Sequence, residues 1–183
     1  FRYAKLTWPE IEDAVEAGKV CIVPCGAVEQ HGPHLPLDVD ILCPTEVAFA
    51  AGRSRPDQLL VLPTVSYGYT GHVMDFPGTI NTHYEHFIDQ VLDITKSLAY
   101  HGFKKIILLN GHGSNWPNLD LVAVAASALF NSNENGASMD KILAALGLAK
   151  GTNDDGVVAA INAHLTSSTA IAKAAGLTET AKS

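Results

Sequence analysis

The sequence is poor in basic residues: its 183 residues include 12 Lys and Arg against 19 Asp and Glu, a formal net charge of −7. A chain with this charge and no basic run lacks the positive surface that binds nucleic-acid phosphates. No apolar stretch approaches the roughly 20 residues of a membrane-spanning helix, and no charged and then apolar leader opens the chain. We therefore expect neither a nucleic-acid partner nor a membrane partner.

Cysteine is scarce as well. The chain has three, Cys21, Cys25 and Cys43, and an odd, small number does not fit the disulfide framework of a small secreted protein. Free thiols persist in reducing compartments, so we expect a cytoplasmic location.

Aromatic residues, proline and cysteine are all missing from residues 131–183, which contain 12 Ala. The composition changes in a polar run at 131–136, which is typical of a linker. We therefore expect a domain over residues 1–130, a linker at 131–136 and a short Ala-rich helical appendage at 137–183.

Within residues 1–130, predicted helices alternate with predicted strands. Short apolar runs favour buried strands at 20–23, 59–62 and 106–109, and apolar spacing or capping signals favour helices at 8–17, 45–51, 82–100 and 118–130. This alternation is typical of an α/β fold with a mostly parallel sheet covered on both faces. Ligands of such folds bind beyond the carboxyl ends of the strands.

Side chains that bind metals follow two of these predicted strands. Glu29, His31 and Asp40 come after the first strand, and His112 comes after the third. Imidazole nitrogen and carboxylate oxygen are suitable ligands for Zn²⁺ or Mn²⁺. Polar residues in Gly- and Pro-rich loops also serve as purely structural turn residues, and spacing alone leaves both interpretations open.

Three motifs occur in a specific order. They are the segment 24–37 followed by Asp40, the Phe-Pro-Gly-Thr-Ile segment at 76–80, and the Leu-Asn-Gly-His-Gly-Ser-Asn segment at 109–115. Together with the Leu-Thr-Trp-Pro-Glu opening at 6–10, they closely resemble the creatininase (creatinine amidohydrolase) family. The resemblance covers about residues 3–125.

The resemblance implies a three-layer αβα fold, commonly assembled as a hexamer, and a hydrolase that uses two divalent ions. Such enzymes cleave non-peptide C–N bonds, usually in cyclic or linear small-molecule amides, with a metal-activated water. By the same resemblance, Glu29, Asp40 and His112 hold one ion, His31 and Asp40 hold the other, and Asp40 bridges the two.

Three further residues are candidates for the site. His34, beside the predicted ligands, is a candidate catalytic acid or base, with loop packing as the alternative. His72 precedes the Phe-Pro-Gly-Thr-Ile segment and is a candidate for substrate binding. Trp116 is a second candidate for the substrate pocket, with packing at a helix entry as the alternative.

The sequence departs from the family pattern in two places. Creatininase proper has a glutamate that binds the second ion at the position of Ser114, so creatinine itself is not the expected substrate. The late His-Ala-Gly and Glu-Thr-Ser motifs of the family are not found, and 162–167 is only a superficial echo of them. Two hypotheses follow: a metal-dependent amidohydrolase, which we favour, and a truncated, non-catalytic remnant that acts only in metal binding or assembly.

Overall fold

The computed structural model describes residues 1–131, and of residues 128–131 it describes the backbone only. The predicted appendage and all but the first residue of the predicted linker lie outside the described residues and stay predictions. Within the described part of the chain, no helix is both long enough and apolar enough to cross a bilayer.

The sheet has three parallel strands in the order β2-β1-β3. They are β1 (Val20–Cys25), β2 (Leu59–Val61) and β3 (Ile106–Asn110). Each strand begins where the sequence predicts it and ends within two residues of the predicted end. The α/β class with a parallel sheet is therefore confirmed.

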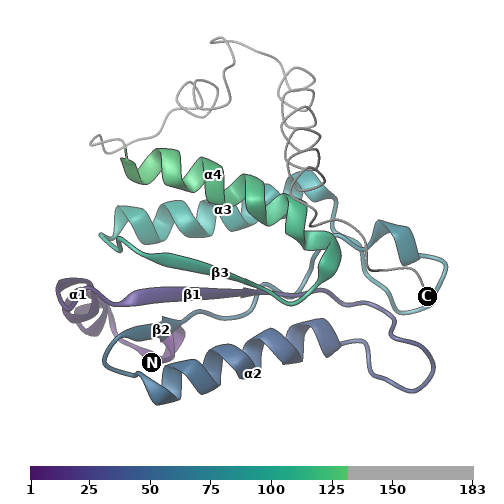
Figure 1. Cartoon of the computed structure of the whole chain (residues 1–183), viewed down its shortest axis with the longest axis horizontal. Coiled ribbons are helices and arrows are strands. Elements are labelled where there is room, and N and C mark those ends of the chain that lie inside the picture. Colours follow the sequence, from purple (N-terminus) through teal and green to yellow (C-terminus); the bar gives the residue numbers. More distant parts are fainter. Residues whose placement is uncertain (132–183) are drawn as a thin grey trace, which may run out of the picture. The chain divides into compact units, whose positions relative to one another are not determined.

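Helices cover both faces of this sheet. The helix α2 packs against all three strands, and α3 and α4 lie on the opposite side of the sheet (Figure 1). The helices are α1 (Trp8–Glu16), α2 (Val39–Ser54), α3 (Tyr84–Tyr100) and α4 (Trp116–Asn131), with short 3₁₀ turns η1 (Tyr3–Lys5), η2 (Gly71–Val73) and η3 (Gly113–Asn115). This is the expected three-layer αβα arrangement.

The central strand β1 is buried along almost its whole length. One face packs against α2, where Ile22, Ala48 and Val61 form a small core with Phe49 beside it. A strand with neighbours on both edges and helices on both faces must be apolar throughout, and this explains the unbroken apolar run in the sequence.

Three helices begin at other residues than the sequence predicts, and of these α4 starts at Trp116 rather than at 118. The helix α2 starts at Val39 rather than at 45, so Asp40 lies in the first turn of a helix and not in a loop. The helix α3 starts at Tyr84, because the Asn81 side chain accepts a hydrogen bond from the Thr70 backbone N–H at 2.8 Å and does not cap the helix. The predicted capping box of α1 is confirmed: both the backbone N–H and the hydroxyl of Thr7 donate to the Glu10 carboxylate at 2.7 Å.

Candidate metal centre

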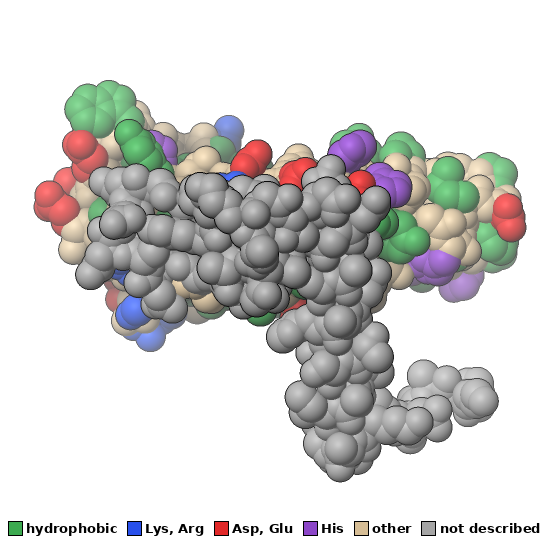
Figure 2. Space-filling model, turned by 90° about the horizontal axis from the view of Figure 1, so that it is seen from above, with side chains coloured by type: hydrophobic (Ala, Val, Ile, Leu, Met, Phe, Trp, Pro, Cys, Tyr) green, Lys and Arg blue, Asp and Glu red, His purple; other side chains and the backbone are tan. Residues whose placement is uncertain are grey.

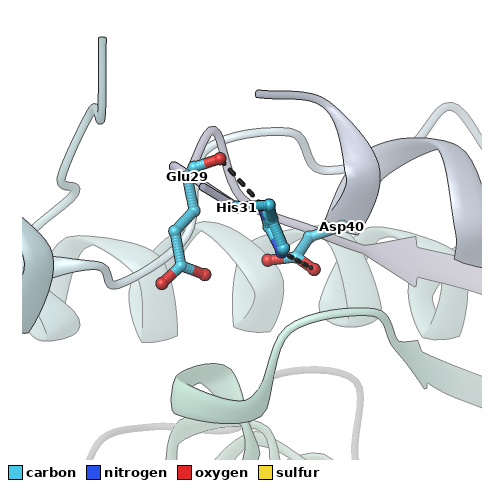
Figure 3. Close-up of side chains that lie close together, drawn as sticks. All are labelled: Glu29, His31 and Asp40. Carbon is cyan, nitrogen blue, oxygen red and sulfur yellow. Dashed lines mark hydrogen bonds and ion pairs between the residues drawn. The ribbon is translucent and has the colours of Figure 1, made fainter. Parts of the chain in front are cut away.

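Three parts of the fold bring the predicted ligands to one end of the sheet. Glu29 and His31 follow β1, Asp40 lies in the first turn of α2, and His112 follows β3. The last residues of β1 and β3 are partners in the sheet, so the segments that leave these two strands begin side by side. Figure 3 shows the side chains of Glu29, His31 and Asp40 gathered in one group.

The four predicted ligands converge. Nδ1 of His112 lies 2.9 Å from Oε2 of Glu29 and 2.8 Å from Oδ2 of Asp40. Nε2 of His31 lies 3.2 Å from Oδ1 of Asp40. Donor atoms bound to one ion at about 2.0–2.2 Å lie roughly 3 Å from each other, so these separations fit shared cations. The Asp40 carboxylate, with one oxygen toward each imidazole, occupies the position of a bridge.

Backbone carbonyl groups determine which nitrogen of each imidazole carries the proton. Nε2 of His112 lies 2.9 Å from the Tyr69 carbonyl oxygen, and Nδ1 of His31 lies 3.0 Å from the Glu29 carbonyl oxygen. A carbonyl only accepts, so these nitrogens donate. In the neutral rings the lone pairs are then on Nδ1 of His112 and Nε2 of His31, both facing carboxylates. Histidines that bind metals are commonly held in this way through their second nitrogen.

The Asp40 carboxylate has an oxygen without a hydrogen bond. Oδ2 is buried and has no hydrogen-bond partner among the described residues. Placing acceptors face to face in a buried site costs free energy unless a cation lies among them. The residues present therefore fit a divalent cation.

Burial also acts on Glu29. Removal from water raises the pKa of its carboxyl, an effect that His112 partly opposes and the neighbouring Asp40 reinforces. Like-charged carboxylates are held together here at a cost that a cation would offset.

The thiol of Cys25, at the end of β1, is not part of the donor set. Burial raises its pKa to about 12, and Sγ is directed to the Val23 carbonyl oxygen at 3.7 Å. A metal-binding cysteine is a thiolate, so the donors here are nitrogen and oxygen. This donor set suits Zn²⁺ or Mn²⁺.

Asn115 supports the site from η3, the 3₁₀ turn just before α4. Its side chain is fully buried, accepts a hydrogen bond from the Tyr69 N–H at 3.0 Å and donates to the Gly26 carbonyl at 2.9 Å. It thereby ties the segment after β1 to the loop that holds the His112 ring. Asn110 accepts a hydrogen bond from the His112 N–H at 3.1 Å. Both asparagines fix turns through hydrogen bonds between their side chains and the backbone.

The three remaining candidates have different surroundings. His72, in η2, borders the cluster: its Nε2 lies 3.6 Å from Oε1 of Glu29. His34 is exposed, and within the described residues no hydrogen bond or ion pair joins it to the cluster. Trp116 is 66% exposed at the start of α4. The structure thus groups His72 with the ligands and does not group His34 with them.

Sequence reasoning missed the Tyr69 and Glu29 carbonyl groups that orient the two imidazoles. Backbone groups leave no signal in residue type, so no pattern could have identified them. The glycine at position 68, by contrast, is visible in the sequence, and the structure explains it. A Cβ at Gly68 would lie only about 2.5 Å from the Asn115 amide.

Comparison with known proteins identifies one family. The family model described as "Creatininase: Creatinine amidohydrolase" matches residues 4–181, a longer segment than the motifs alone cover. A creatinine amidohydrolase from Pseudomonas putida is 39% identical over 117 residues, which are 61% of this chain and 44% of that protein. A mycofactocin precursor peptide peptidase from Mycobacterium ulcerans is 33% identical over 120 residues, 60% of this chain and 42% of that protein.

Solved structures agree with these relatives. A creatininase described as a manganese form superposes with a TM-score of 0.60 at 36% identity, over 67% of this chain and 51% of the other. A mutant creatininase described as a Zn-Zn type gives 0.60 at 37% identity, over 66% and 50%. The chain thus spans about half the length of the proteins that it matches, or less.

Proposed function

Since this chain belongs to the creatininase family, we propose that it is an amidohydrolase that hydrolyses a non-peptide C–N bond with a metal-activated water. The observation that carries the proposal is the convergence of Glu29, His31, Asp40 and His112. In addition, the lone pairs of both imidazoles are directed at the carboxylates.

The ligand roles are those that the family resemblance implies, and the contacts support them. We assign Glu29, Asp40 and His112 to one ion, His31 and Asp40 to a second, and Asp40 as the bridge. Zn²⁺ or Mn²⁺ held by these residues would lower the pKa of a water and polarise a carbonyl. The chain's own contribution is to fix the two tautomers through the Glu29 and Tyr69 carbonyls and to hold the carboxylates in a largely water-excluded position.

The proposed substrate class rests on the family and on the residue at position 114. The matched relatives include a creatinine amidohydrolase and a peptidase of a precursor peptide, so the family accepts more than one amide. Ser114 stands where creatininase proper has a ligand glutamate. We therefore propose a cyclic amide or formamide other than creatinine as the substrate. We further propose Trp116 as a wall of its pocket, His34 as the acid or base, and a homo-oligomer, of the hexameric kind that the resemblance implies, as the assembly.

Metal content and turnover test this function together. The chain is stripped with a chelator, reloaded with Zn²⁺ or Mn²⁺, and assayed on a panel of small cyclic and linear amides and formamides. We expect turnover that the chelator abolishes and the metal restores.

The matched variants are Asp40→Ala and Asp38→Ala. Asp38 lies just before α2, is exposed and has no contact with the cluster among the described residues. We expect Asp40→Ala to lose bound metal and activity and Asp38→Ala to keep both. If Asp40→Ala retains the full metal content, the bridging role is wrong.

A non-catalytic role in metal binding or assembly is the second candidate. Elemental analysis showing one ion or none per chain, together with no turnover across the amide panel, would favour this candidate.

A further inference from the structure

His72 has the same two-sided surroundings as the two predicted histidine ligands. In each of the three rings, one nitrogen contacts a neutral oxygen of the chain and the other faces a carboxylate. For His72 the neutral partner is the Ser114 hydroxyl, 3.5 Å from Nδ1, and the carboxylate is Glu29, whose Oε1 lies 3.6 Å from Nε2. This arrangement orients metal-bound histidines.

The position of the ring supports the same reading. The rings of His72 and His112 are stacked with 6.2 Å between their centroids and 17° between their planes. The His72 ring therefore lies beside the ring of a predicted ligand, His112. Nε2 of His72 is nearest to Oε1 of Glu29, whereas Nδ1 of His112 is nearest to Oε2. The side chain is 49% exposed, so the ring borders solvent. Figure 2 shows histidine side chains next to acidic ones on one face of the molecule.

The loop that carries His72 is anchored close to it. Thr70 is fully buried, its N–H donates to the Asn81 side chain at 2.8 Å, and its hydroxyl donates to the Ile80 carbonyl at 2.9 Å. The preceding residue, Tyr69, holds the His112 ring through its carbonyl. A displacement of this loop would therefore move both imidazoles.

We propose that His72 is a fifth metal ligand, which binds the cation at Glu29 from the solvent side and is held by Ser114. The inference rests on the proposed function, since it requires a cation at the cluster. It changes the role of His72 from substrate contact to ligand, and it gives Ser114 the role of orienting an imidazole. Ser114 is then a positioning residue.

The test is Co²⁺ affinity, measured by competition with a chromophoric chelator, for the whole chain and its variants. We expect His72→Ala to weaken the binding of one Co²⁺ by at least about tenfold, because even loss of a group that only orients a metal ligand costs about 10–100-fold in metal affinity. Added imidazole should restore much of the affinity, because it can enter the position that the exposed ring vacates. Ser114→Ala should weaken binding less than His72→Ala.

The matched control is His83→Ala. His83 has a 54% exposed side chain, and its Nδ1 lies 3.5 Å from a carboxylate oxygen of Glu85, so it resembles His72 in exposure and pairing. It lies at the N-terminal end of α3 and belongs to no ligand group among the described residues. We expect it to bind Co²⁺ as the unaltered chain does.

The outcomes separate this inference from the proposed function. If the unaltered chain binds Co²⁺, Asp40→Ala loses it, and His72→Ala binds within about twofold of the His83→Ala control, the ligand role of His72 is wrong and the proposed function stands. If the unaltered chain binds no Co²⁺, the proposed function fails and the inference fails with it.

Discussion

Gly111 lies against the backbone carbonyl of Asp40 so closely that a Cβ at position 111 would collide with the oxygen. Pro44, one helical turn after Asp40, has no N–H to donate to that carbonyl, and its ring also lies against Gly111. Gly26, at the end of β1, meets the same carbonyl. The first turn of α2 thus packs between the ends of β1 and β3, where there is room for glycine but not for a residue with a Cβ atom.

Gly111→Ala is therefore expected to push Asp40 away from His112. Overpacking against backbone atoms costs about 1–3 kcal/mol, so the melting temperature should fall and the Co²⁺ affinity should decrease with it. Thermal unfolding and chelator competition measure the two effects.

Gly113→Ala is the matched control, because nothing lies within 4 Å of a Cβ built at that residue. It should leave stability and affinity almost unchanged. Equal behaviour of the two variants would contradict the close contact at Gly111.

Asn115→Ala should destabilise the fold by about 2–4 kcal/mol. It leaves the Tyr69 N–H and the Gly26 carbonyl without their buried partner, and an unsatisfied buried group costs about 1–3 kcal/mol. Metal affinity should fall too, since Tyr69 orients His112. Denaturant unfolding of the metal-free chain measures the first effect.

Asn118→Ala is the comparison for this variant. Asn118 is also buried on α4, but its side chain makes no hydrogen bond within the described residues. We expect a smaller loss of stability from it, and a loss as large as that of Asn115→Ala would mean that cavity formation outweighs the hydrogen bonds.

The raised pKa of Glu29 predicts how the stability of the metal-free chain depends on pH. The folded state holds the Glu29 proton more tightly than the unfolded state, so its contribution is fully present below the ordinary value of 4.5 and is lost as pH rises through the raised pKa. Bound metal requires the carboxylate and should reverse this trend over the same range. Glu29→Gln should remove the metal-free component of the dependence, and unfolding curves between pH 4 and about 7 test it.

The cysteines should differ in reactivity toward a thiol reagent. Burial raises the pKa of Cys21 and of Cys25 to about 12, whereas Cys43 is exposed on α2. Since the thiolate is the reactive form, one thiol per folded chain should react near neutral pH, and all three after denaturation. Mass spectrometry of the labelled peptides identifies them, and labelling of Cys25 in the native chain would contradict its burial.

Bound metal should not change this labelling pattern. The Cys25 thiol is directed away from the donor set, toward the Val23 carbonyl. Protection of a thiol by Zn²⁺ would show that sulfur takes part in the site.

The extent of α2 shows why some elements could not be predicted. The residues between 39 and 45 include Pro44 and lie close after a Gly- and Pro-rich loop, a pattern that favours irregular structure. Packing of the helix against the sheet overrides this local preference, with Asp38 as the N-cap. At α3 the helix is shorter than predicted. The Asn81 side chain accepts a hydrogen bond from the Thr70 N–H, and the helix begins at Tyr84.

Residue types and their order were enough to indicate the parallel α/β fold, the capping box of Thr7 and Glu10, and the choice of Glu29, His31, Asp40 and His112 as candidate ligands. These features depend on side-chain chemistry and on neighbours along the chain. Only the tertiary structure decided that the four side chains meet, that the Tyr69 carbonyl fixes the His112 proton, and that His72 joins Glu29 while His34 does not. Such contacts depend on the pairing of β1 with β3 and on the glycine-lined entry of α2, which bring together residues far apart in the chain.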